Sequence, residues 1–319
     1  MCVLVYVDDL IIGCKNEDEI NRVYSDLRDK FEITDCGPVR FFLGFEIERE
    51  DGFYSLRLTS YIEQLVSKFG MMDAAPVKTP MDSGYITVNS DSKLFLDTTR
   101  YRCLEGALLY LTVNARSDVS ISVGLLGRKV NEPNQSDWKA AKRVLQYLNT
   151  TKCWKLKFSP GESWKLVGYS DSDWAGDQRT RRSTSGIIFF FGGSPISWTS
   201  KGQESVALSS LEAEYNALTL ACQEAIWIRR LLKDLGEPQI EATILFEDNQ
   251  GCICFAKAER ASGRVKHIET KSHFIRELCE RKTIVLTYCP SSEMIADGLT
   301  KPLGQSLHKM FVERIGLSA

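Results

Sequence analysis

The chain has 319 residues, of which 43% are hydrophobic and 26% charged, and these proportions are typical of a globular protein of roughly two or three domains. The formal net charge is −2, so no overall positive field points to a nucleic-acid partner, and any such binding must come from local basic patches. No apolar run approaches the ~18 residues of a membrane-spanning helix and no signal peptide is visible, so we expect an intracellular, cytoplasmic protein with no membrane partner.

The first predicted element is a β-hairpin with acids at its tip. Apolar runs at 3–7 and 10–12 flank Asp8 and Asp9, which places a carboxylate pair at the turn. Asn16 is expected to cap the helix that follows, in which apolar residues recur every three or four positions.

The middle of the chain is predicted to change from strands to helices. A second hairpin spans 41–58 and a short helix spans 61–69. Pro, Gly, Ser, Asn and Asp are frequent from 74 to 98, which indicates a linker. Three helical patterns between 101 and 149 then predict a helical connector.

The last part of the chain is predicted to be a mixed α/β domain, with a sheet of about five strands and flanking helices. Strands are expected at 156–158, 165–170, 186–191, 196–200, 243–246 and 283–288, with a long helix from Ser209 to about Leu235 and a last helix from about Ile295. The expected regions are a strand-rich N-terminal part (1–78), a linker (79–98), the helical connector (99–152) and the α/β domain (153–319).

Three acids follow the strand in KLVGYSDSDWAGD, namely Asp171, Asp173 and Asp177. Carboxylates held rigidly at a strand end repel one another unless a cation offsets the repulsion, as metal-dependent phosphoryl chemistry requires. An Asp-rich turn is the alternative explanation for this stretch alone.

Four acids lie at the ends of predicted elements in the last region: Asp171, Glu214, Asp248 and Asp297. Strand C-termini and helix N-termini meet at one rim of a mixed α/β sheet, so these four could converge. Two Mg²⁺ ions need that many oxygen ligands, and held about 4 Å apart they would support hydrolysis of a phosphodiester. Helix dipoles and capping also favour acids at such positions, which is the structural alternative for each one singly.

Glu212 illustrates that alternative. Ser209 and Glu212 have the spacing of a capping box, so we assign Glu212 to helix capping and Glu214 to the metal site. The reverse assignment, with Glu212 as the ligand, stays open from the residues alone.

Several motifs then resemble a known family. The last region resembles the ribonuclease H region of copia-type retrotransposon polyproteins in GYSDSDWAGD, STSGIIFFFGGSPISWTSKGQ, SSLEAEYNAL, EDNQG, KHIETKSHFIRE and ADGLTKPL. Near the start, YVDDL is similar to the catalytic hairpin of their reverse transcriptase, and FFLGFEI and YRCLEGALLYLT are similar to the segments that follow it. The resemblance runs in order over essentially the whole chain.

The resemblance implies roles for the acids. It implies that Asp171, Glu214, Asp248 and Asp297 are the metal-binding acids of a ribonuclease H, and that Asp173 occupies a neighbouring position that is not usually a ligand. It also implies the end of a reverse transcriptase palm and a thumb in 1–78.

In that palm, Asp8 and Asp9 match an acid pair that holds metal together with a third Asp from an upstream strand. That strand, the fingers and most of the palm are absent from this sequence. We therefore expect polymerase activity to be lost in this chain alone.

Histidine and cysteine give little sign of a zinc site. Cellular ribonucleases H carry a mobile His in the loop that corresponds to 289–294, and this loop has none. His267 and His273 lack the further ligands that a zinc ion requires. The ten cysteines include no CxxC pair, so we expect reduced thiols.

Two short basic stretches are candidates for contacts with a nucleic-acid backbone. The alternative is that they form a solvated charged surface. The residues are Arg179, Arg181 and Arg182 in the first stretch and Arg264, Lys266, His267 and Lys271 in the second.

The resemblance implies a Mg²⁺-dependent ribonuclease H, with two ions and with Mn²⁺ as a substitute, that hydrolyses the RNA strand of an RNA–DNA hybrid. It implies the rest of the Pol polyprotein as a partner and a particle-associated location in a full element. Two other hypotheses stay open: an inert remnant or structural nucleic-acid-binding subunit, and a polymerase that acts only with a complementing chain.

Overall fold

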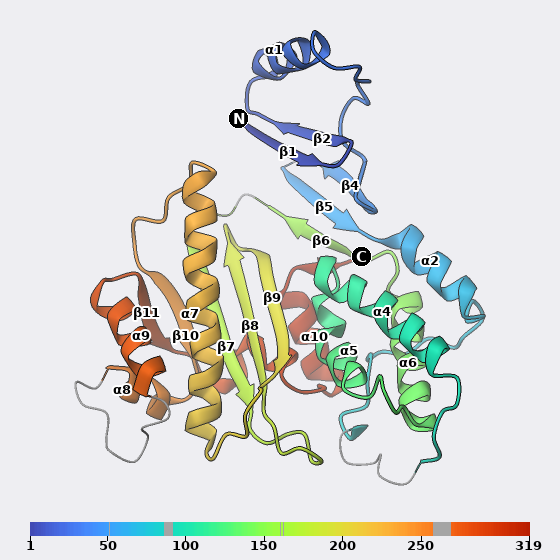
Figure 1. Ribbon diagram of the computed structural model, residues 1–319, viewed down its shortest axis with the longest axis vertical. Coiled ribbons are helices and arrows are strands. Elements are labelled where there is room, and N and C mark those ends of the chain that lie inside the picture. Colours follow the sequence, from blue (N-terminus) through green and yellow to red (C-terminus); the bar gives the residue numbers. More distant parts are fainter. Residues whose placement is uncertain (51, 86–91, 160, 162, 258–268) are drawn as a thin grey trace.

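The computed structural model describes residues 1–50, 52–85, 92–159, 161, 163–257 and 269–319 (Figure 1). The strands are β1 (Cys2–Tyr6), β2 (Asp9–Gly13), β3 (Phe41–Phe42), β4 (Phe45–Glu50), β5 (Phe53–Arg57), β6 (Lys155–Phe158), β7 (Leu166–Asp173), β8 (Thr184–Phe191), β9 (Ser194–Gly202), β10 (Thr243–Glu247), β11 (Ile284–Tyr288) and β12 (Leu317–Ser318). The helices are α1 (Glu17–Arg28), α2 (Thr59–Lys68), α4 (Thr98–Asn114), α5 (Ser120–Gly127), α6 (Gln135–Thr150), α7 (Ser210–Asp234), α8 (Gln250–Lys257), α9 (Glu269–Glu280) and α10 (Gln305–Arg314), with 3₁₀ turns η1 (Ser117–Val119), η3 (Ser291–Glu293) and η4 (Ile295–Leu299).

The predicted mixed five-stranded sheet is confirmed, in the order β11-β10-β7-β8-β9. β7, β8 and β9 are antiparallel, while β10 and β11 run parallel to β7. The apolar run of β8 serves both faces because side chains alternate along a strand. Ile187 and Phe189 join the core under α7, whereas Ile188 and Phe190 join the core under η4 and α10. A strand buried on both faces therefore needs an unbroken hydrophobic sequence.

A second sheet, β12-β6-β5-β4-β3, joins distant parts of the chain. The predicted second hairpin is present as β4 and β5, and β5 also pairs with β6. β6 pairs on its other side with β12 at the C-terminus, where Leu156 and Leu317 share one core. This sheet therefore crosses the predicted boundary between 152 and 153, and the region bounds themselves stay a prediction.

The connector helices α4, α5 and α6 pack with α2 around one large core, and part of the predicted linker enters it, since Met81 is only 2% exposed. Within this body a buried ion pair joins Arg116 to Asp118 at 2.8 Å. The Tyr147 hydroxyl donates to Asp118, and His308 of α10 lies 3.0 Å from the Tyr147 oxygen. This network ties the connector to the C-terminal helix.

The N-terminal hairpin and α1 lie apart from that body (Figure 1). Asn16 caps α1 as predicted, but no residue of α1 is buried, and every residue of β1 is exposed. The helical spacing therefore predicted the helix correctly, and in the part of the chain that the structure describes no element covers its apolar face.

The end of the chain differs from the prediction. A single last helix from about Ile295 is wrong, because the segment divides into η4 and α10. Pro302 lies between them and cannot donate the backbone hydrogen bond that a continuous helix needs. In the part of the chain that the structure describes, no helix has the length and apolarity to cross a membrane.

Candidate metal centre

Strand register brings two of the predicted acids together. β7 and β10 are parallel neighbours in which Tyr169 pairs with Phe246, and Asp171 and Asp248 each lie two residues further on. Glu214 approaches from the second turn of α7, the helix that covers β7. Ligand oxygens of Asp171, Glu214 and Asp248 all lie within 4.8 Å of one another.

Asp297 arrives from η4, which lies against the other face of the sheet. On β8, Gly186 pairs with Asp171 of β7. A side chain at position 186 would come within 2.7 Å of Thr300 and 2.9 Å of the Ala296 carbonyl oxygen. A glycine at this position therefore lets the 296–300 segment approach the strand that carries Asp171. Asp297 lies close enough for its charge to raise the pKa of Asp171, although it is outside the compact group of three.

Neighbouring polar groups hold most of these carboxylates in place. The Thr300 hydroxyl donates to Asp171 at 2.5 Å, and the Ser291 hydroxyl donates to Asp248 at 2.7 Å. Lys301 pairs with Asp297 at 2.8 Å. Ser291 belongs to the loop in which cellular ribonucleases H would carry a histidine, so in this chain the loop supplies a hydroxyl to a site acid.

Burial and crowding raise the pKa of two of these acids, Asp171 and Glu214. Burial, followed by the charge of Asp297, raises the pKa of Asp171 to about 7. Burial, followed by the charges of Glu247 and Asp171, raises the pKa of Glu214 to about 10. The buried Ser172 hydroxyl beside it lowers the pKa of Glu214, but this is the smallest of the contributions. Protonation or a bound cation is therefore required to relieve the repulsion.

The donor set fits a hard divalent cation. Glu214 is only 6% exposed and its Oε2 atom has no hydrogen-bond partner, which is costly for a buried carboxylate oxygen. All the converging ligands are carboxylate oxygens, the kind that Mg²⁺ and Mn²⁺ accept. Asp171, Glu214 and Asp248 would hold the ions, with Asp297 beside them.

Sequence reasoning missed three residues that belong to this site. Glu247 is fully buried beside Asp248 and accepts a hydrogen bond from Ser170 at 2.9 Å. Thr300 and Lys301 each hold a predicted acid. The available signals were the acid pair that ends β10 and the position of Lys301 four residues after Asp297, which favours contact on a helical turn.

Among the acids outside the predicted four, Glu212 caps a helix as predicted and Asp177 organises a turn, whereas Asp173 is the last residue of β7. The Ser209 hydroxyl accepts from the Glu212 amide, and Glu212 in turn accepts from the Leu208 amide, so Glu212 caps α7. Asp177 accepts from two amides of the following turn, and these bonds together with Arg128 lower its pKa despite burial. Asp173 is half-buried and outside the compact group.

Asp8 and Asp9 are in a different environment. Both are exposed at the tip of the β1–β2 hairpin, and among the described residues no third acid joins them in a metal-binding group. The structure thus brings together acids of the last region, whereas Asp8 and Asp9 are exposed to solvent.

The first predicted basic stretch lies beside the site. Arg179, Arg181 and Arg182 are exposed on the turn that Asp177 organises, directly after the strand that carries Asp171. Arg264, Lys266 and His267 of the second stretch lie outside the described residues. Lys271 is described, and its ammonium donates to Asn216 of α7 at 2.5 Å.

The chain is similar to parts of known retrotransposon proteins. A family model described as reverse transcriptase (RNA-dependent DNA polymerase) matches residues 1–83. The Pol polyprotein from transposon TNT 1-94 of Nicotiana tabacum is 35% identical over 99% of this chain, and that of transposon RE1 of Arabidopsis thaliana is 34% identical over 99%. A putative transposon Ty5-1 protein of Saccharomyces cerevisiae is 32% identical over 67% of this chain and 70% of its own length.

The chain belongs to the copia-type retrotransposon Pol polyproteins. It spans only about a quarter of the tobacco relative, at 24%, and 22% of the Arabidopsis one. The activities and partners of those longer proteins are therefore proposals for this Pol chain.

Solved structures agree on the fold. A foamy viral protease-reverse transcriptase solved with an RNA/DNA hybrid is 13% identical, covers 91% of this chain and 36% of its own, and has a TM-score of 0.50. The predicted fold class is confirmed: the chain is a mixed α/β (α+β) protein, and its last region contains the predicted mixed five-stranded sheet.

Proposed function

We propose that this Pol chain hydrolyses the RNA strand of an RNA–DNA hybrid by metal-assisted phosphodiester hydrolysis. The observation that carries the proposal is the buried convergence of Asp171, Glu214 and Asp248 at one rim of a ribonuclease H-like sheet. Membership of the Pol family supports it, because the family model at the N-terminus describes an RNA-dependent DNA polymerase, whose product is such a hybrid.

Two Mg²⁺ ions, or Mn²⁺ in their place, would supply an activated water and stabilise the oxygen that leaves the scissile phosphate. The protein would contribute a rigid set of oxygens. Thr300 orients Asp171 and Ser291 orients Asp248, so that each carboxylate keeps one direction before substrate arrives. Glu214 offers a buried oxygen that no protein group satisfies.

A polar cavity supports contacts between the protein and the sugar–phosphate backbone of the hybrid. Gln203 bridges from the Ala213 carbonyl to Asn216, and Asn216 accepts from Lys271, each contact at 2.9 Å or less. Gln203, Asn216 and Lys271 line a cavity of about 290 Å³. Together with the exposed turn at Arg179–Arg182, the cavity presents cations and amides that can contact phosphates. Contacts of this kind do not distinguish one base sequence from another.

The test is cleavage of a labelled RNA–DNA hybrid in Mg²⁺ by the wild type and by Asp248→Asn. Activity in the wild type that falls by roughly a thousandfold in the variant is expected, because the substitution removes a charged metal ligand. Asp234→Asn, at the far end of α7, is the matched control and should cleave as the wild type does. An inactive wild type would favour the inert or structural role, and equal cleavage by Asp248→Asn would reject the site.

A second candidate, polymerase activity with a complementing chain, is favoured by the exposed hairpin. A lone two-stranded sheet is marginally stable, and among the described residues β1 and β2 pair only with each other. The strand edges and Asp8 and Asp9 are thus available to strands from another polypeptide. Primer extension should appear only when the remainder of the palm is added, and extension by this chain alone would contradict that dependence.

A further inference from the structure

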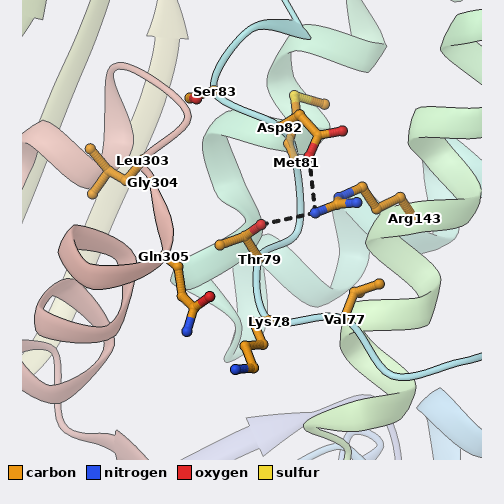
Figure 2. A pocket seen from close by; sticks show the side chains of 10 residues that line it. All are labelled: Val77, Lys78, Thr79, Met81, Asp82, Ser83, Arg143, Leu303, Gly304 and Gln305. Atoms are coloured by element: carbon orange, nitrogen blue, oxygen red, sulfur yellow. Dashed lines mark hydrogen bonds and ion pairs between the residues drawn. The ribbon is translucent and has the colours of Figure 1, made fainter.

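A cavity of about 380 Å³ lies away from the acid site, between the segment at 77–83, helix α6 and the start of α10 (Figure 2). Its polar lining includes Lys78, Thr79 and Arg143, and Gly304 and Gln305 close the opposite side. No role in the proposed cleavage reaction accounts for this lining.

The cavity contains a cation, Lys78, that no group in the described part of the chain neutralises. Among the residues that the structure describes, Lys78 makes no hydrogen bond or ion pair. Arg143 is held in place by Asp82 at 3.0 Å and by the Thr79 hydroxyl at 3.1 Å, while its Nε atom is buried without a partner. Two cations therefore face one carboxylate, and Asp82 itself is 73% exposed to solvent.

The opposite wall adds hydrogen-bond donors. The first backbone N–H groups of a helix have no intrahelical partners. At the start of α10 the N-cap residue is Gly304, so no side chain of that residue accepts a hydrogen bond from them. Nothing lies within 4 Å of the position that a Gly304 side chain would occupy. The position beside Gly304 is open, and the helix dipole makes the N-terminal end of α10 favourable for an anion.

The surrounding connector is also positive. Residues 98–152 contain nine Lys and Arg against four Asp and Glu, a net charge of +5, whereas the whole chain has −2. Such a local field attracts a polyanion to this part of the surface at moderate salt concentrations.

We propose that this cavity binds a backbone phosphate of the RNA–DNA hybrid at a distance from the scissile bond. The inference rests on the proposed function for the identity of the polyanion. Asp297 and Gly304 are seven residues apart in the sequence, which limits their separation to about 25 Å. At about 3.4 Å of rise per nucleotide, the bound phosphate lies no more than roughly seven nucleotides from the cleavage position.

The first test measures hybrid binding by fluorescence anisotropy in an Asp248→Asn background, in which the hybrid stays intact. Lys78→Ala is expected to weaken binding about fivefold at physiological salt and to reduce the slope of log K against log salt by about one. Lys233→Ala, at the far end of α7, is the matched lysine control and should leave both quantities unchanged. Equal affinities and slopes for Lys78→Ala and its parent would overturn the proposal.

A second variant separates binding from folding. Gly304→Asp places a carboxylate where the phosphate is expected, and as an N-cap it should also stabilise α10 slightly. Weaker hybrid binding together with an unchanged or higher melting temperature supports the cavity. Unchanged binding would reject it.

The third test locates the phosphate. Hybrids with one neutral methylphosphonate linkage are scanned along each strand, with Lys78 present or replaced by Ala. A linkage within about seven nucleotides of the cut should weaken binding to the parent and have no further effect on Lys78→Ala. Losses that simply add at every position would contradict the contact. Because binding is measured without cleavage, a failure of the proposed nuclease reaction and a failure of this cavity give different results.

Discussion

Two pairs of strand-end acids in this chain have opposite environments. Asp8 and Asp9 lie at the tip of an isolated hairpin in which all of β1 is exposed. Asp171 and Asp248 also end neighbouring strands, but α7 and η4 cover those strands and bring further acids to them. Burial and like charges raise the pKa of Asp171 to about 7.

The difference shows that two acids at a turn do not make a metal site. A third element must bring more oxygens and exclude water, and it then makes the ionised acids costly without a cation. In the last region α7 supplies Glu214 and η4 supplies Asp297. In the N-terminal hairpin no element of the described chain has that role.

The largest expected effect of this difference is on catalysis. Glu214→Gln should reduce hybrid cleavage in Mg²⁺ by roughly a thousandfold, because it removes the charge of a converging metal ligand. Asp9→Asn should leave cleavage unchanged, since Asp9 is exposed on a separate sheet. Single-turnover cleavage rates at saturating Mg²⁺ measure both. Comparable losses in the two variants would remove the distinction between the acid sets.

The next effect compares the stability of the two parts. Asp118→Ala leaves the guanidinium of Arg116 buried without its counter-ion, and removal of one partner from a buried pair costs about 3–5 kcal/mol. Asp26→Ala, on the exposed surface of α1, should change the free energy of unfolding by less than about 0.5 kcal/mol. Urea unfolding followed by tryptophan fluorescence measures the difference, and a small loss for Asp118→Ala would mean that the network contributes little.

The sequence predicted most of the elements and the four acids of the last region. Apolar alternation and helical spacing are local, so β7, β8 and α7 could be placed within a few residues. Asp171, Glu214 and Asp248 were found because strand ends and helix starts meet at one rim of a sheet. Asp297 was placed at a helix start, but Pro302 divides that helix.

What the sequence could not predict depends on contacts between distant segments. β6 looked like a strand of the last domain, yet it pairs with β5 and β12, which no local pattern specifies. The apolar spacing in α1 predicted a helix, but whether that face is buried depends on another element that covers it. Gly186 gave no sign that it makes room for Thr300 beside Asp171.

The third expected effect is a gain in the free energy of unfolding, whereas most substitutions reduce it. The folded pKa of Asp171 is raised from 3.8 to about 7, so without metal its contribution to stability is present below pH 4 and is lost as pH rises through 7. At pH 8 in EDTA, Asp171→Asn should therefore be more stable than the wild type by an amount on the order of 4 kcal/mol, since each pKa unit corresponds to about 1.4 kcal/mol. The gain should disappear near pH 3.

Urea titrations at the two pH values measure this gain, and Asp8→Asn is the control for which no gain is expected. Mg²⁺ should raise the melting temperature of the wild type more than that of Asp171→Asn, because binding to the folded state stabilises it. If the wild type were as stable as Asp171→Asn at pH 8 without metal, the carboxylates of the site would not repel one another enough to destabilise the fold.

The smallest effect concerns the hairpin itself. Val5 is 66% exposed in β1, whereas Val144 in α6 is fully buried. Val→Thr keeps the shape of the side chain and adds a hydroxyl, so in the core it costs about 1–3 kcal/mol and on the surface almost nothing. Val144→Thr should therefore lower the free energy of unfolding, and Val5→Thr should change it by less than about 0.5 kcal/mol. If Val5→Thr were as harmful as Val144→Thr, β1 would have to be covered in solution, and the hairpin would belong to the same cooperative unit as the connector helices.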